Sequence, residues 1–152
     1  MVVQEVESLR WFTPFFVMMQ NILHQVGNDP GCPYIVLSSF TGSAAANVNG
    51  QTLHYLFGFK FGAKFISMSD KQWDEKRNQF QNLKCLIIDE ISLVGCELFY
   101  NLDLKLQEIM MVDDIMGGIS VFLFGDMFQL KPIKEGYIYM NLRMLSIVWL
   151  SS

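Results

Sequence analysis

The stretch that decides the fold is Leu86-Ile87-Ile88-Asp89-Glu90, in which an apolar run ends in two adjacent carboxylates. It belongs to a predicted strand over residues 84–89, and two similar runs predict strands over 34–39 and 119–124. The three runs are continuously apolar rather than alternating. This pattern is typical of strands that are buried on both faces of a parallel sheet.

Helical patterns separate these strands. Apolar residues recur at helical spacing over 10–26 and over 99–109, and the small residues 43–47 predict a short helix. An S-x-x-Q capping box at 69–72 opens a polar helix. Strands that alternate with helices predict an α/β domain. In such a domain ligands bind beyond the carboxyl ends of the parallel strands.

Composition excludes several classes of protein. The 152 residues are 51% hydrophobic, which is enough for the core of one domain, and the net charge of −4 is not that of a self-sufficient DNA-binding module. Three cysteines without a C-x-x-C spacing disfavour a disulfide framework or a zinc site and favour an intracellular setting. The apolar stretch 11–19 is too short to cross a bilayer, and the acidic residues before it disfavour a signal peptide.

The pair Asp89-Glu90 is the first motif that could carry chemistry. In enzymes that hydrolyse ATP, an aspartate after a buried strand holds magnesium and a neighbouring glutamate orients the attacking water. The alternative is a structural strand whose aspartate caps the next helix. Taken alone, this segment supports the two interpretations about equally.

Two further motifs follow the other predicted strands. The segment 125–130 (GDMFQL) contains a glutamine that could reach the terminal phosphate of a nucleotide. The segment 39–46 (SFTGSAAA) offers a hydroxyl and backbone N–H groups that suit a phosphate. Taken singly, a turn and a helix start with small residues are the better explanations. His54, which follows in the segment QTLH, is by itself better explained as a packed histidine.

In combination, these segments resemble the petite-integration-frequency (Pif-one) type DNA helicases, which include relatives carried by rolling-circle transposons. The resemblance covers about 34–133, within a chain read as a single incomplete domain over 1–152. Its most specific parts are NLKCLIIDEISLV (82–94), similar to the family's magnesium motif, and GGISVFLFGDMFQL (117–130), similar to its sensor motif.

The resemblance implies a RecA-like parallel sheet with flanking helices, and ATP with Mg²⁺ as substrate and cofactor. By position, it implies that Asp89 binds magnesium through water and that Glu90 acts on the hydrolytic water. It also implies that Gln129, together with Gly125 and Asp126, senses the γ-phosphate.

The resemblance further implies 5′-to-3′ unwinding of DNA, with roles in DNA repair, recombination and telomere maintenance. Single-stranded DNA would contact Thr41 and Gly42, and His54 would lie near its path. The family also implies a nuclear location if the source is eukaryotic, and no membrane.

The sequence departs from the family in ways that bear on activity. No glycine is followed by lysine, so the phosphate-binding motif G-x-x-x-x-G-K-[ST] is absent. The first strand of the sheet and its phosphate loop are therefore expected to be missing. The second motor domain of the family has no counterpart in this sequence and is also expected to be missing. Ser43 stands where the family usually has lysine. The isolated chain is accordingly expected to be inactive, and the alternative is a decayed, non-catalytic relative that at most binds DNA or a protein partner.

The missing first strand has a consequence for association. In the RecA-like sheet that the resemblance implies, it would lie beside the predicted strand 119–124, so that the edge of this strand is expected to be unpaired. An unpaired apolar edge predicts self-association of the chain.

Overall fold

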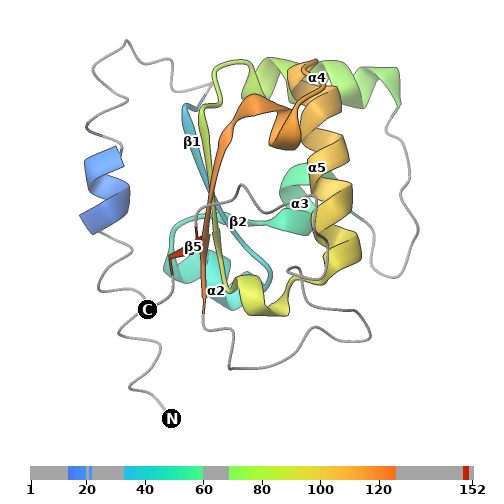
Figure 1. The fold of residues 1–152 in the computed structure, drawn as a ribbon. Coiled ribbons are helices and arrows are strands. Elements are labelled where there is room, and N and C mark those ends of the chain that lie inside the picture. Colours follow the sequence, from blue (N-terminus) through green and yellow to red (C-terminus); the bar gives the residue numbers. More distant parts are fainter. Residues whose placement is uncertain (1–13, 20, 22–32, 60–68, 126–148, 151–152) are drawn as a thin grey trace.

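A computed structural model describes residues 14–19, 21, 33–59, 69–125 and 149–150 of the chain, and its centre is a parallel sheet (Figure 1). The strand order is β2-β1-β3-β4-β5. The strands are β1 (Ile35–Ser39), β2 (Gln51–Thr52), β3 (Cys85–Asp89), β4 (Ser120–Phe124) and β5 (Trp149–Leu150). The predicted strands 34–39, 84–89 and 119–124 are each confirmed to within one residue.

Strand β3 occupies the middle of the sheet, and all five of its residues are buried. Both edges of β3 are protected from solvent, because it pairs with β1 on one side and with β4 on the other. Layers of side chains also cover both of its faces. Burial on both faces therefore explains why the sequence of β3 is continuously apolar, as predicted.

Three helices cover one face of the sheet: α3 (Leu53–Phe57), α4 (Asp70–Phe80) and α5 (Cys96–Met110) (Figure 1). The predicted apolar face of α5 is confirmed, because each of its four residues is at most 3% exposed: Phe99, Leu102, Leu106 and Ile109. The capping box of α4 is also confirmed, since the Gln72 side-chain oxygen accepts from the Ser69 backbone N–H at 3.0 Å.

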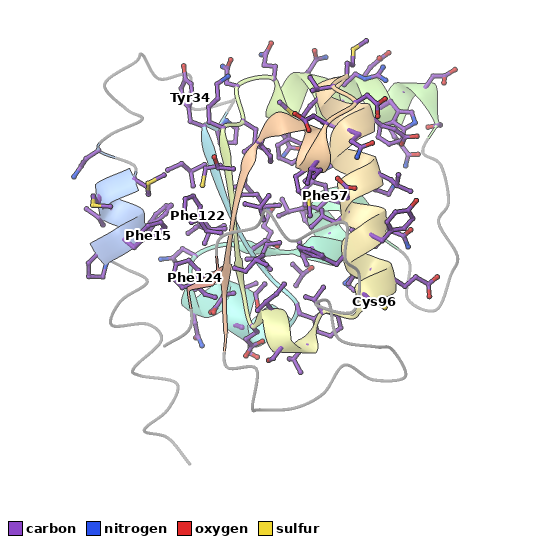
Figure 2. All side chains as sticks on the ribbon, in the orientation of Figure 1. Phe15, Tyr34, Phe57, Cys96, Phe122 and Phe124 are labelled. Carbon is purple, nitrogen blue, oxygen red and sulfur yellow. The ribbon has the colours of Figure 1, made fainter. Side chains whose placement is uncertain are left out.

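The opposite face carries a smaller apolar layer. Residues 14–19 are helical, and Figure 2 shows Phe15 pointing from them toward two phenylalanines of β4. The ring centroid of Phe15 lies 5.1 Å from that of Phe122 and 5.5 Å from that of Phe124. The remainder of the helix predicted over 10–26, apart from residue 21, lies outside the described residues.

The edge of β4 differs from the expectation. The carboxyl-terminal half of this edge is paired in parallel with β5. The paired residues are Leu123 with Trp149 and Phe124 with Leu150. The prediction was wrong here because a later part of the same chain supplies a strand. Backbone groups at an apolar edge are stabilised by any strand that can reach them.

The Gly-Gly segment before β4 has a steric explanation. Gly117 lies in a 3-10 turn, Ile115–Gly118, with a φ of +62°. A Cβ at this position would lie 2.6 Å from the backbone oxygen of Leu106, so a side chain would collide with α5. The turn is also held by Asp103, whose Oδ1 accepts from the backbone N–H of Met116 at 2.6 Å.

We therefore predict that Gly117→Ala lowers the free energy of unfolding by about 2 to 4 kcal/mol, from left-handed strain together with the collision. Gly118→Ala is the matched control. It has a φ of +73°, but its added Cβ would meet nothing closer than 3.6 Å. It should cost only about 1 kcal/mol. Urea denaturation measures both variants, and equal losses would contradict the packing of this turn on α5.

Candidate functional site

Asp89 is the last residue of β3 and pairs in register with Ser39, the last residue of β1. The residue is only 8% exposed. Burial raises the pKa of its carboxyl group, and repulsion from Glu90 adds to this, while a hydrogen bond from the backbone N–H of Glu90 to Oδ1 (2.9 Å) opposes the rise. A buried carboxylate in this position favours the approach of a cation.

Asp89 does not cap the helix that follows it, and its carboxylate could contribute to a magnesium site. The residue that precedes the 3-10 helix Ile91–Leu93 is Glu90, and no side chain caps that helix. Within the described ranges no lysine or arginine forms an ion pair with Asp89. The same ranges contain no group of three or more His, Cys, Asp or Glu residues that could hold a metal. One carboxylate, completed by water and phosphate oxygens, is the kind of protein contribution that Mg²⁺ commonly uses with nucleotides.

Glu90 has a strained backbone, with φ 54° and ψ 42° in the left-handed region. For a residue other than glycine this conformation is costly and persists only where surrounding contacts enforce it. Its carboxylate oxygen Oε2 accepts a hydrogen bond from Oγ1 of Thr41 at 2.8 Å. The hydrogen bond therefore joins the segment after β3 to the segment after β1.

Gly125, the residue after β4, packs against the backbone that carries Glu90. A Cβ on Gly125 would lie 3.0 Å from the backbone nitrogen of Ile91 and 3.5 Å from the carbonyl carbon of Glu90. Glycine thus allows the end of the predicted sensor strand to contact the acidic segment. Asp126 and Gln129, the other predicted sensor residues, lie outside the described residues.

Thr41 and Gly42 lie where β1 passes into α2 (Gly42–Asn47), which confirms the short helix predicted over 43–47. Thr41 is the N-cap of this helix, and its hydroxyl accepts from the backbone N–H of Ala44 at 3.3 Å. Gly42 is exposed. The structure therefore brings four of the predicted residues to one edge of the sheet: Thr41, Asp89, Glu90 and Gly125.

His54 lies in α3, which starts at the same edge because Thr52 pairs with Ser39. Its ring makes edge contacts with Phe40 and Phe59, at centroid distances of 5.6 and 6.1 Å. Burial lowers its pKa, so the imidazole is neutral at pH 7. A neutral ring can hydrogen-bond to a phosphate but does not attract it as a cation would.

Ser39 was not singled out from the sequence as a site residue. Its hydroxyl is fully buried and has no hydrogen-bond partner in the part of the chain that the structure describes. It is the register partner of Asp89, so the two side chains lie on the same face of the sheet. The signal was available: Ser39, like Asp89, is a polar residue at the end of a predicted strand.

Comparison with known proteins decides the family, since the profile described as PIF1-like helicase matches residues 17–148. The chain belongs to this family. It is 36% identical over 122 residues to the ATP-dependent DNA helicase RRM3 of Saccharomyces cerevisiae, covering 78% of this chain and 17% of that protein. With the ATP-dependent DNA helicase PIF1 of Homo sapiens it shares 31% identity over 105 residues, covering 66% and 16%.

Solved helicase structures agree with the fold. The crystal structure of Pif1 from Bacteroides in complex with ADP-AlF3 and ssDNA matches with a TM-score of 0.64 and 27% identity, covering 86% of this chain and 34% of that one. Pif1 from Candida albicans matches with a TM-score of 0.63 and 25% identity, covering 90% and 33%. The resemblance to this helicase family and the α/β, partial RecA-like fold class are confirmed.

The PIF1-like chain spans about one sixth of the length of the two curated relatives, 17% and 16%. Among the residues that the structure describes, none forms a helix with the length and apolar character needed to traverse a membrane.

The raised pKa of Asp89 leads to a prediction about stability. Its carboxyl group holds its proton more tightly in the folded state than in the unfolded chain, where the ordinary pKa is 3.8. Folding therefore becomes less favourable as the pH rises through the folded pKa. In the absence of Mg²⁺, Asp89→Asn should raise the free energy of unfolding at pH 7 by about 1 kcal/mol.

The advantage of Asp89→Asn should vanish below pH 3.8, where the unfolded carboxyl group is also protonated. Denaturant titrations at pH 3 and pH 7 with EDTA measure both effects. The matched control is Asp74→Asn on the exposed side of α4, where the aspartate side chain is 73% exposed and the change should be small. Destabilisation by Asp89→Asn at pH 7 would show that the carboxylate is already neutralised by the protein.

Proposed function

We propose that this chain provides the magnesium- and water-binding part of the first motor domain of an ATP-dependent DNA helicase. The observation that carries the proposal is the meeting of Asp89, Glu90 and Gly125 at the carboxyl edge of one parallel sheet. The curated relatives are named as ATP-dependent DNA helicases, and one similar structure is a complex with ADP-AlF3 and ssDNA. By extension from the family, the reaction is 5′-to-3′ unwinding that serves DNA repair, recombination and telomere maintenance.

In this proposal each residue at the edge has a separate task. Asp89 would hold a magnesium ion through a water molecule, and such an ion would neutralise charge on the phosphates of ATP. Glu90 accepts a hydrogen bond from the attacking water and orients it toward the γ-phosphate. Gln129, with Gly125 and Asp126, contacts the γ-phosphate and distinguishes ATP from ADP.

The DNA-binding side of the proposal uses the segment after β1. Thr41 and Gly42 present a hydroxyl and a backbone N–H to a phosphate of single-stranded DNA, and His54 lies near this path. The hydroxyl of Ser43, which is 3.4 Å from Oγ1 of Thr41, stands where the family usually has lysine. Loss of that cation removes an attraction to the phosphate backbone.

A second candidate function is non-catalytic. We infer that the 152-residue chain by itself binds single-stranded DNA without turning over ATP, because its sequence has no G-x-x-x-x-G-K-[ST] motif to supply the phosphate-binding lysine. Magnesium-dependent ATP turnover by this chain that Glu90→Gln abolishes would contradict the non-catalytic candidate and support the enzyme.

The DNA contact predicts a gain of affinity. Ser43→Lys should bind a fluorescein-labelled oligothymidylate about threefold to tenfold more tightly at low salt, because the new cation meets a phosphate. The slope of log K against log [salt] should steepen by about one unit. Fluorescence anisotropy at several NaCl concentrations measures both quantities.

The matched control is Ser120→Lys, which adds the same charge at the exposed first residue of β4, the opposite end of the strands. It should leave the affinity and the salt slope close to those of the unmodified chain. Equal gains from the two substitutions would show general charge attraction and would contradict a DNA site at α2. No binding by any of the three proteins would reject the DNA part of the proposal.

A further inference from the structure

A hydrogen bond links Thr41 to Glu90, although the proposed function gives the two residues separate roles. Thr41 Oγ1 donates to Glu90 Oε2 at 2.8 Å, across 49 positions of sequence. Thr41 belongs to the proposed DNA contact, and Glu90 belongs to the proposed water site. A direct contact between these side chains means that the state of one constrains the other.

Thr41 cannot donate a hydrogen bond to Glu90 and to a DNA phosphate at the same time. A threonine hydroxyl has one proton to donate, and its oxygen can also accept. In this structure Oγ1 accepts from the Ala44 backbone N–H at 3.3 Å and donates its proton to Glu90. A DNA phosphate is an acceptor only, so Thr41 can donate to the phosphate only if the hydrogen bond to Glu90 breaks.

Electrostatics acts in the same direction. A phosphate bound at Thr41 would bring a negative charge close to the carboxylate that now accepts from the same hydroxyl. Two like charges a few ångströms apart repel strongly in a partly buried site. The phosphate therefore both removes the donor from Glu90 and drives its carboxylate away.

The backbone around Glu90 limits what can move. Its backbone is left-handed, and Gly125 packs against the next residue, where an added Cβ would lie 3.0 Å from the backbone nitrogen of Ile91. If the Thr41 hydrogen bond breaks, rotation of the Glu90 side chain can move the carboxylate while the backbone keeps its conformation. Freed from Thr41, the carboxylate oxygen is available to accept from water.

We propose that Thr41 is a positioning residue for Glu90, which it holds away from the water site until its hydroxyl donates to a phosphate of single-stranded DNA. The proposal rests on the proposed function, in which Glu90 acts on water and Thr41 contacts DNA. It adds that the Thr41 hydroxyl redirects its one donated hydrogen bond from Glu90 to a DNA phosphate. DNA binding thereby releases the residue that orients the water.

The first part of the test is made without DNA. We expect urea denaturation to reveal coupling in a double-mutant cycle made of Thr41→Val, Glu90→Ala and the double variant. Thr41→Val also removes the helix cap, but this effect is the same with and without Glu90 and therefore cancels in the cycle. The effects should be non-additive by roughly threefold or more in the unfolding equilibrium constant, as expected for a hydrogen bond to a charged group. Additive effects would overturn the proposal, because no coupling would then exist between the two side chains.

The second part measures affinity for labelled oligothymidylate. Glu90→Ala should tighten binding by about threefold or more, because it frees the Thr41 proton and removes a repelling charge. The gain should persist with Thr41→Ser, which keeps the hydroxyl, and should be much smaller with Thr41→Val. The matched control is Glu75→Ala on exposed α4, which removes the same charge and should not tighten binding.

The outcomes separate this proposal from the proposed function. If Glu90→Ala increases DNA affinity equally in the Thr41→Ser and Thr41→Val variants, or in neither, the role of the Thr41 hydroxyl is overturned. The proposed DNA site is not affected by that result. Failure of every variant to bind DNA overturns both the DNA site and the role of the Thr41 hydroxyl. Non-additivity in urea together with a hydroxyl-dependent gain in DNA affinity supports the proposal.

Discussion

The parallel register between β1, β3 and β4 is the constraint on which the rest of the structure depends. Because Ser39 pairs with Asp89 and Ile88 pairs with Leu123, the three strands end at the same edge of the sheet. The residues that follow them are then neighbours, although they are about 35 to 50 positions apart in sequence. Burial of β3 on both faces stabilises this register, since a slip by one residue would turn Asp89 into the other apolar layer.

The edge stores a modest amount of unfavourable free energy. The carboxylate of Asp89 is buried with a raised pKa, and Glu90 has a left-handed backbone. Functional sites commonly retain such costs, because removing them would stabilise the fold and abolish the chemistry. Both of these costs lie at the carboxyl end of β3, where the packing of Gly125 and the hydrogen bond from Thr41 hold Glu90 in place.

Much of the fold could be predicted from local patterns. The apolar runs predicted β1, β3 and β4, and the helical spacing predicted the buried face of α5, because burial leaves a periodic trace in the sequence. Strand β5 could not be predicted, since two residues carry no periodic signal and pair only because β4 offers an open edge. Buried Asp103 and Lys105 were also missed, because polar residues on a helix are normally exposed.

The site was predictable in part. Strand ends and the family motifs indicated Asp89, Glu90, Thr41 and Gly125, and the structure brings these residues together. The hydrogen bond between Thr41 and Glu90 was not predictable, because it depends on the conformations of two turns rather than on residue type. Ser39 could have been noticed in the sequence as a polar strand end, but its pairing with Asp89 is known only from the structure.

The most direct test of the central claim is to locate the metal at this edge by paramagnetic relaxation. Mn²⁺ with ADP, added to the ¹⁵N-labelled chain in place of Mg²⁺, broadens the amide signals of residues near the bound ion. If the metal binds at the end of β3, the amide signals of Ser39, Asp89, Glu90 and Gly125 broaden first, and Asp89→Asn removes the effect. Broadening centred on the exposed acidic residues of α4, or broadening that survives Asp89→Asn, would contradict the assignment of the metal to the end of β3.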